Sequence, residues 1–255
     1  MLWAMLPEIK SMMMMMMMMT QLSVEHICEN GRMYVCCRGR QWKMADEVIL
    51  GIDVGTTTVK LVAMRACDEE VIGSWSCETK ASVVSDAGSL ASEQDAGKIM
   101  SAVDSCMCKI SASLAARITK IGVSGQMHGV VMWTRHPQSQ DVGNKMSSLS
   151  EDLSCRFTKL SNLYTWQDGR CSPQFLSSIP TPESHLRIAT GFGCCTLFWL
   201  NRHEPGSLER YRCAGTVQDL LVTILCGLEH PLMSCHNAAS WGYFDTVTAS
   251  WNTNL

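Results

Sequence analysis

Two apolar runs in residues 48–64 flank a turn rich in glycine and threonine. The segment reads VILGIDVGTTTVKLVAM. Short runs of β-branched and aliphatic residues on both sides of such a turn are typical of a β-hairpin. The segment EVIGSWS at residues 70–76 alternates apolar and polar positions and predicts a third strand. The sequence therefore predicts three consecutive strands.

A helical period follows these strands. Ser92 is placed to cap a helix that begins near Glu93, and Glu93 and Asp95 would supply acids to its first turn. The segment ITKIGV at residues 118–123 predicts the next strand. Strands interrupted by a helix indicate a mixed α/β sheet. The apolar stripe expected on the helix, with spacings of three or four residues, consists of Ile99, Val103, Cys106, Ile110 and Leu114.

The later part of the chain is predicted to contain an insertion and two buried helices. Residues 134–159 are polar, show no clear period and predict an exposed insertion. Residues 190–200, TGFGCCTLFWL, predict a glycine-marked turn that enters a helix. Residues 216–226 predict a second helix, which Gly227 would end. Residues 236–245, HNAASWGYFD, place small residues before an aromatic strand.

Composition narrows the class of protein. The chain has 255 residues, 46% of them hydrophobic, which suits one or two globular domains. A net charge of −3 gives no overall positive field for nucleic acid or for an anionic membrane, so neither is expected as a partner. The fourteen cysteines include no C-x-x-C spacing, and we interpret them as reduced thiols of a cytoplasmic protein, without a metal site.

The first 43 residues differ from the rest. They include eight consecutive methionines, Met12 to Met19, with no basic start or cleavage site of a signal peptide and too few apolar residues to span a bilayer. Met44 lies just before the first predicted strand. We expect residues 1–43 to be a disordered, dispensable extension and residues 44–255 to form the folded domain.

The turn of the hairpin is a candidate phosphate site. Gly55 has no Cβ and would let backbone N–H groups approach a phosphate oxygen, while Thr56, Thr57 and Thr58 add hydroxyl donors. Asp53 could hold a hydrated Mg²⁺ against that phosphate. The same residues are also good turn formers between two strands, so an ordinary turn remains an alternative.

Two further segments carry candidate sugar-binding groups. SGQMHG follows the strand at residues 118–123, and its Gln126 and His128 offer amide and imidazole groups suited to sugar hydroxyls. TWQDGR offers Trp166 to cover a sugar face and Asp168 with Arg170 to bond its hydroxyls. A structural histidine, and a surface ion pair beside a buried tryptophan, are the alternatives.

The order of these motifs resembles the N-terminal half of an FGGY-family carbohydrate kinase. The motifs GIDVGTTTVK, EQD, SGQMHG, TWQDGR, ATGFGC and NAASWGYFD carry the resemblance, which covers residues 44–255. SGQMHG with TWQDGR is similar to pentulose and heptulose kinases, and NAASWGYFD with SWN points to the latter. Asn237 and Ser240 in this last motif would be ligand contacts or turn formers.

The resemblance implies a ribonuclease H-like N-terminal domain of the actin-like ATPase superfamily and transfer of a phosphate from ATP, with Mg²⁺, to a ketose. It places Asp53 near the metal and the transferred phosphate, and the turn from Gly55 to Thr57 near the γ-phosphate. The ketose site that it implies consists of Gln126, Met127, His128, Trp166, Asp168 and Arg170.

The resemblance also predicts what this sequence lacks. Family members take the proton from the sugar hydroxyl with an aspartate in a later G-D segment, and the sequence ends at Leu255 before any such segment. The C-terminal domain is expected to be absent with it. Cys235 and His236 stand where an acid or amide is expected. An inactive fragment that keeps part of the sugar and phosphate site is therefore the alternative to an active sugar kinase.

Overall fold

The computed structural model describes residues 47–136, 153, 156–183 and 187–252. These residues form two compact units. Unit 1 contains the described residues up to Glu78 together with Ala102–Gly125, and unit 2 contains Thr79–Ser101 and the described residues from Gln126 onward. The predicted extension at residues 1–43 and most of the predicted insertion lie outside the described residues.

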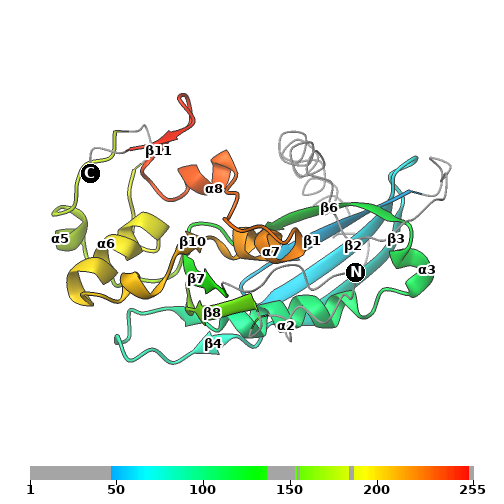
Figure 1. Cartoon of the computed structure of the whole chain (residues 1–255), viewed down its shortest axis with the longest axis horizontal. Coiled ribbons are helices and arrows are strands. Elements are labelled where there is room, and N and C mark those ends of the chain that lie inside the picture. The colour runs from blue at the N-terminus through cyan, green and yellow to red at the C-terminus, as the bar shows by residue number, and fades with distance from the viewer. Residues whose placement is uncertain (1–46, 137–152, 154–155, 184–186, 253–255) are drawn as a thin grey trace. The chain divides into compact units, whose positions relative to one another are not determined.

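Unit 1 is built on a four-stranded sheet in the order β3-β2-β1-β6. β1 pairs antiparallel with β2 and parallel with β6, and β2 pairs antiparallel with β3. Figure 1 shows these strands side by side, from blue through cyan to green. All the strands predicted in this region are confirmed. Their bounds are Val48–Val54 (β1), Thr58–Arg65 (β2), Val71–Glu78 (β3) and Ile118–Gly125 (β6).

The predicted start of the first helix is wrong. Glu93 and Gln94 form the short strand β5, and helix α2 spans Ala96–Met107. β5 pairs with β4 (Ser82–Val83) on one side and with β9 (Leu163–Tyr164) on the other, so its backbone groups are used in a sheet. The cap is Asp95, whose Oδ1 accepts the Lys98 N–H at 3.0 Å, and Ser92 does not take that role.

The predicted extension of the apolar stripe is also wrong. Ile99, Val103 and Cys106 are buried on α2, as predicted. Ile110 and Leu114 lie beyond its end, because the chain turns and a new short helix, α3 (Ala112–Ala115), begins. The hydroxyl of Ser111 accepts the Leu114 N–H and caps α3, which stops α2 from continuing.

Unit 2 combines short strands with helices. β7 pairs with β8 and β10, β5 pairs with β4 and β9, and β11 pairs with β12. The ends of the predicted insertion belong to this pattern, since Thr134 on β7 pairs with Lys159 on β8. The strands are Ser82–Val83 (β4), Glu93–Gln94 (β5), Val131–Arg135 (β7), Phe157–Leu160 (β8), Leu163–Tyr164 (β9), Cys213–Gly215 (β10), Phe244–Asp245 (β11) and Ser250–Trp251 (β12).

Both buried helices predicted for this unit are confirmed. α6 spans Gly193–His203, and α7 spans Val217–Leu225 with Gly227 at a positive φ of 62° after its end. A core forms around Val130, Met132, Leu200 and Trp241. No helix in the described part of the chain is long and apolar enough to cross a bilayer. Other helices that the structure describes in full in this unit are α5 (Pro173–Leu176), the 3₁₀ helix η3 (Leu208–Arg210) and α8 (Cys235–Ala239).

Candidate active site

Asp53 lies near the end of β1, beside the hairpin turn of unit 1. In the sheet it is opposite Lys60 on β2 and Ser124 on β6. Burial raises the pKa of its carboxyl, and attraction to Lys60 and a hydrogen bond with Ser124 oppose that rise only in part. A nearby cation would favour the ionised form of this carboxylate. A single, partly exposed carboxylate suits Mg²⁺, which keeps several of its waters in proteins.

The glycine of the turn is required by the hairpin itself. The Gly55 N–H donates to the Thr58 carbonyl oxygen at 3.1 Å. A Cβ on Gly55 would lie 2.8 Å from that same oxygen. The N–H of Gly55 is therefore used inside the protein, and this structure does not offer it to a phosphate.

The chain turns sharply after β6, at the predicted sugar-binding segment. The Gln126 side-chain N–H₂ donates to Gln94 Oε1 at 3.0 Å, which fixes the amide. Gln126 Oε1 is buried and accepts no hydrogen bond from the residues that the structure describes. A buried amide oxygen without a donor is costly, and a ligand hydroxyl would satisfy it.

His128 is held in a strained backbone conformation. Its φ is 68°, and the Gly129 N–H donates to the Met127 carbonyl oxygen at 2.8 Å, which closes a tight turn of the rare γ type. A Cβ on Gly129 would lie 2.5 Å from the Tyr164 carbonyl oxygen, so the close approach expected of this glycine is to the protein's own backbone. Strain of this kind is often found at functional sites.

The imidazole of His128 has a defined orientation. Its ring stacks on Phe192 with centroids 4.5 Å apart and 5° between the planes. Nδ1 lies 2.9 Å from the Ser240 carbonyl oxygen. Because a carbonyl only accepts, Nδ1 carries the proton, and Nε2 of the neutral ring remains an acceptor. Ser240 thus contributes its backbone to the site by orienting the histidine.

Asp168 and Arg170 form a buried ion pair. The side chain of Asp168 is 0% exposed and that of Arg170 is 3% exposed. Asp168 Oδ1 accepts from Arg170 N and Nε at 3.1 and 2.8 Å, and Oδ2 accepts from Ser92 N and Arg170 Nη2, both at 2.9 Å. These bonds occupy the carboxylate. Both oxygens of Asp168 are therefore already used, and neither is available for the expected bond to a sugar hydroxyl in this structure. The alternative, an ion pair at the surface, is wrong in its location, because the pair is buried.

Glu93 completes this cluster and was not among the sequence-predicted site residues. Its Oε1 accepts from Arg170 Nη2 and from the Ser85 hydroxyl, both at 2.7 Å, and Oε2 accepts from Asn162 Nδ2 at 2.9 Å. Burial raises the pKa of this carboxyl, but the bonds from its partners together leave it below the usual value. The motif EQD contains Glu93, and interpreting it as the first turn of a helix concealed its role.

Trp166 lies on an exposed turn held by the same cluster. Its side chain is 47% exposed, the opposite of the buried tryptophan in the alternative interpretation. The Thr190 hydroxyl donates to the Asp168 carbonyl oxygen at 2.7 Å. Gly191, with φ of 79°, lies so close that a Cβ there would be 2.2 Å from the Trp166 carbonyl oxygen. The motifs TWQDGR and ATGFGC are thus packed together, and they present the indole to solvent.

A second buried polar group joins α7 to α8. Asp219 Oδ2 accepts from the Thr216 N–H and hydroxyl, both at 2.8 Å, and Oδ1 accepts from Asn237 Nδ2 at 3.2 Å. Burial is the largest influence and raises the pKa of Asp219 to about 6. The side chain of Asn237 therefore bonds within the protein, and the predicted alternative of a ligand contact has no support from these bonds.

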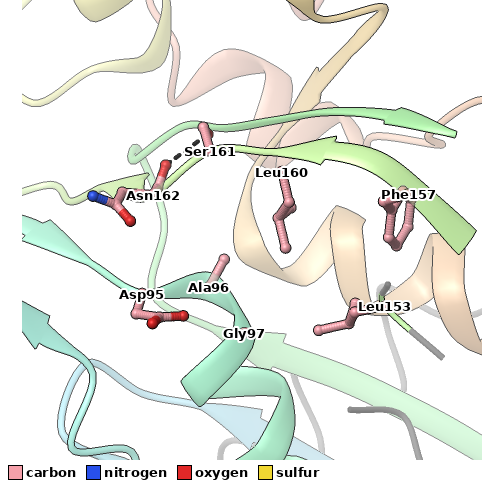
Figure 2. A pocket seen from close by; sticks show the side chains of 8 residues that line it. All are labelled: Asp95, Ala96, Gly97, Leu153, Phe157, Leu160, Ser161 and Asn162. Carbon is pink, nitrogen blue, oxygen red and sulfur yellow. Dashed lines mark hydrogen bonds between the residues drawn. The ribbon is translucent and has the colours of Figure 1, made fainter. Parts of the chain in front are cut away.

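A pocket of about 390 Å³ in unit 2 borders the Glu93 cluster through Asn162, which donates to Glu93. Figure 2 shows it between the start of α2 and β8 with the two residues that follow β8. Its lining contains none of the predicted sugar-binding residues, and its carboxylate, Asp95, already caps α2. Its residues are Asp95, Ala96, Gly97, Leu153, Phe157, Leu160, Ser161 and Asn162.

Solved structures of sugar kinases resemble this chain. Ligand-bound xylulose kinase from Lactobacillus acidophilus matches with a TM-score of 0.59 at 20% identity, over 81% of this chain and 38% of that one. Plasmodium falciparum glycerol kinase with ADP matches with a TM-score of 0.61 at 18% identity, over 81% of this chain and 39% of that one. These likenesses confirm the predicted α/β fold.

Curated relatives are more similar in sequence. Human sedoheptulokinase is 43% identical over 216 residues, which are 82% of this chain and 44% of that protein. Mouse sedoheptulokinase is 44% identical over 214 residues, 80% of this chain and 43% of that protein. Xylulose kinase from Escherichia coli (strain K12) is 28% identical over 209 residues, 80% of this chain and 38% of that protein. The chain thus spans less than half the length of these relatives.

Residues 48–255 match the FGGY family of carbohydrate kinases, N-terminal domain. The match includes the Asp53 hairpin, the strained turn at His128 and the Glu93 cluster. The chain therefore belongs to the FGGY family of carbohydrate kinases.

Proposed function

We propose that the protein acts as an ATP-dependent sugar kinase. It transfers the γ-phosphate of ATP to a ketose, sedoheptulose, and the product is sedoheptulose 7-phosphate. The choice of sugar rests on the similarity to two sedoheptulokinases. The observation in the site that carries the proposal is the buried oxygen of Gln126, which accepts no hydrogen bond from the described residues. A small-molecule partner and a cytoplasmic location are part of the same proposal.

Hydrogen-bond acceptors of the protein would hold the sugar. Gln126 Oε1 and His128 Nε2 both accept, and a sugar hydroxyl can donate to each of them. Met127 would contact the sugar between them, and the exposed indole of Trp166 would cover an apolar face. We assign Asp168 and Arg170 an indirect role, because their polar atoms bind one another and Glu93.

The phosphate part of the reaction would involve the hairpin of unit 1. Mg²⁺, when bound, neutralises charge on the transferred phosphate. Asp53 would hold that ion through water, and Thr56 and Thr57, beside Gly55, would donate to phosphate oxygens. The hairpin fixes the turn by the Gly55 to Thr58 bond, so these donors are oriented before ligand arrives.

A second candidate function is sugar binding without transfer. It is favoured by the state of Asp168, the carboxylate among the sequence-predicted sugar residues, whose oxygens are occupied by Arg170 and Ser92. Transfer requires a group that takes the proton of the attacking hydroxyl.

The two candidates are separated by measuring binding and turnover on the same preparation. Titration calorimetry with sedoheptulose tests binding, and release of ADP from ATP and Mg²⁺ tests transfer. Turnover that Asp53→Asn lowers by about 100-fold or more, with an unchanged melting temperature, supports the kinase. The matched control, Asp86→Asn at an exposed aspartate, should turn over as the wild type does. Binding without turnover supports the second candidate, and the absence of both contradicts the proposal.

A further inference from the structure

Cys77 has a cation fixed beside its sulfur. It lies on β3, at the edge of the described sheet of unit 1, and is half-buried. Lys109 Nζ donates to the Ser76 carbonyl oxygen at 2.9 Å and to Cys77 Sγ at 3.1 Å. The bond to the backbone holds the ammonium in place, where it favours the thiolate form of Cys77.

A second thiol lies near this sulfur. Cys106 is buried on α2, and its Sγ lies 3.8 Å from the Val59 carbonyl oxygen. Val59 is the residue paired with Cys77 between β2 and β3, so the thiol of Cys106 is directed to the place where Cys77 lies. The two thiols are close enough that each influences the pKa of the other.

The pKa values of the two thiols are shifted in opposite directions. Burial, the largest single influence, raises the pKa of Cys106. Burial also acts on Cys77, but the influence of Cys106 and Lys109 outweighs it and lowers the pKa of Cys77. Cys77 is therefore the sulfur of the pair at which the nucleophilic thiolate is favoured.

We propose that Cys77 and Cys106 form a redox modification site that a peroxide converts into an intramolecular disulfide. The Cys77 thiolate attacks one oxygen of hydrogen peroxide, the O–O bond breaks, and hydroxide leaves as the sulfur is oxidised to a sulfenic acid. Cys106 sulfur then attacks Cys77 sulfur, the S–O bond breaks, and the thiol proton leaves with the hydroxyl group as water. In sum, two thiols and one peroxide give one disulfide and two waters.

Three cysteines of unit 2 differ from this pair in unit 1. Burial raises the pKa of Cys171 and Cys194 to about 12 and that of Cys195 to about 11. None of the three has the lowered pKa of Cys77, so a thiolate that could attack a peroxide is disfavoured at each of them. The proposed site is thus selected by Lys109 and by the neighbouring thiol, not by exposure alone.

Disulfide mapping tests the proposal on the full chain. Trypsin releases Cys77 in residues 66–80 with Cys67, and Cys106 in residues 99–109 with Cys108. Cys67→Ser with Cys108→Ser therefore leaves one cysteine in each peptide, and both replaced residues are exposed. After peroxide treatment and alkylation, mass spectrometry should find the two peptides linked, and a reductant should separate them.

Two variants in that background separate the steps. Cys106→Ser should prevent the link and let dimedone trap the sulfenic acid on Cys77. Lys109→Met should slow the oxidation of Cys77 about threefold or more, because the pKa of Cys77 rises and its thiolate fraction falls when the cation is removed. Lys109→Arg retains the cation and should keep most of the rate.

The proposal fails if both cysteines are still reduced when the exposed Cys235 is already oxidised, or if the disulfide joins other cysteines. It also fails if Lys109→Met leaves the rate unchanged while circular dichroism shows a folded protein. No sugar or nucleotide enters this experiment, so its outcome is independent of the proposed kinase function.

Discussion

Asp219 illustrates how one residue can couple stability to pH. Its carboxyl is 3% exposed and is held by Thr216 and Asn237, yet no cation pairs with it among the described hydrogen bonds and ion pairs. Burial therefore dominates and raises its pKa to about 6. The folded protein binds the proton more tightly than the unfolded chain between about pH 4 and pH 6.

We predict that Asp219 makes the folded state less stable as pH rises through this window. The stabilisation is fully present below the unfolded pKa and is lost above the folded pKa. The loss should be on the order of 2–3 kcal/mol. Urea unfolding of the wild type and of Asp219→Asn at pH 4.5 and pH 6.5 measures it, because the difference between the two proteins cancels the other titrating groups. Equal pH slopes for both would contradict the prediction.

At the scale of an element, the residue at the start of α6 is restricted by the packing of Trp241 against it. Gly193 is the first residue of the helix, and a Cβ there would lie 2.2 Å from Trp241 Cε2 and 2.6 Å from its Nε1. Helix propensity alone favours alanine over glycine by about 1 kcal/mol. Packing of the buried indole against the helix backbone opposes that preference.

We expect Gly193→Ala to lower the free energy of unfolding by about 1–3 kcal/mol in spite of the gain in propensity, because the ring must move. Asn201→Ala, at an exposed position of the same helix, is the matched control and should be neutral or slightly stabilising. Denaturant melts compare the two. An equal or higher stability of Gly193→Ala would show that Trp241 moves at little cost.

At the scale of the whole molecule, two units each have a core of their own. The Glu93, Asp168 and Arg170 cluster belongs to unit 2, where the Arg170 guanidinium also lies over Tyr164 and Trp199, 4.6 and 5.1 Å from the ring centroids. Removing one partner of a buried ion pair leaves uncompensated charge. The damage should therefore concentrate in the unit that holds the cluster.

We predict that Arg170→Met destabilises unit 2 by about 3–5 kcal/mol, while Arg202→Met, at an exposed arginine, costs under about 1 kcal/mol. Hydrogen exchange should rise in β5 and β9 and change little in β1 and β2. A uniform rise across both sheets would indicate that the units unfold together.

Local patterns in the sequence were enough for the existence of the longer elements, those of seven or more residues, and for the family. The strands β1, β2, β3 and β6 and the helices α6 and α7 follow from apolar periodicity and from glycine signals. The prediction that a helix starts near Glu93 was wrong, because that residue pairs in a sheet with β9, about seventy residues away. The prediction that Leu114 extends the same helix was wrong, because Leu114 belongs to α3, a separate helix capped by Ser111.

The sequence by itself determined the fold class, the Asp53 hairpin and the candidate sugar segments, since these depend on residues close together in the chain. Tertiary structure alone decided that Asp168 is buried and bound to Arg170, that Trp166 is exposed, and that Glu93 joins the cluster. It also brought Cys77 and Cys106 together. The physical reason is that burial and hydrogen-bond partners come from segments distant in sequence, and no local period records them.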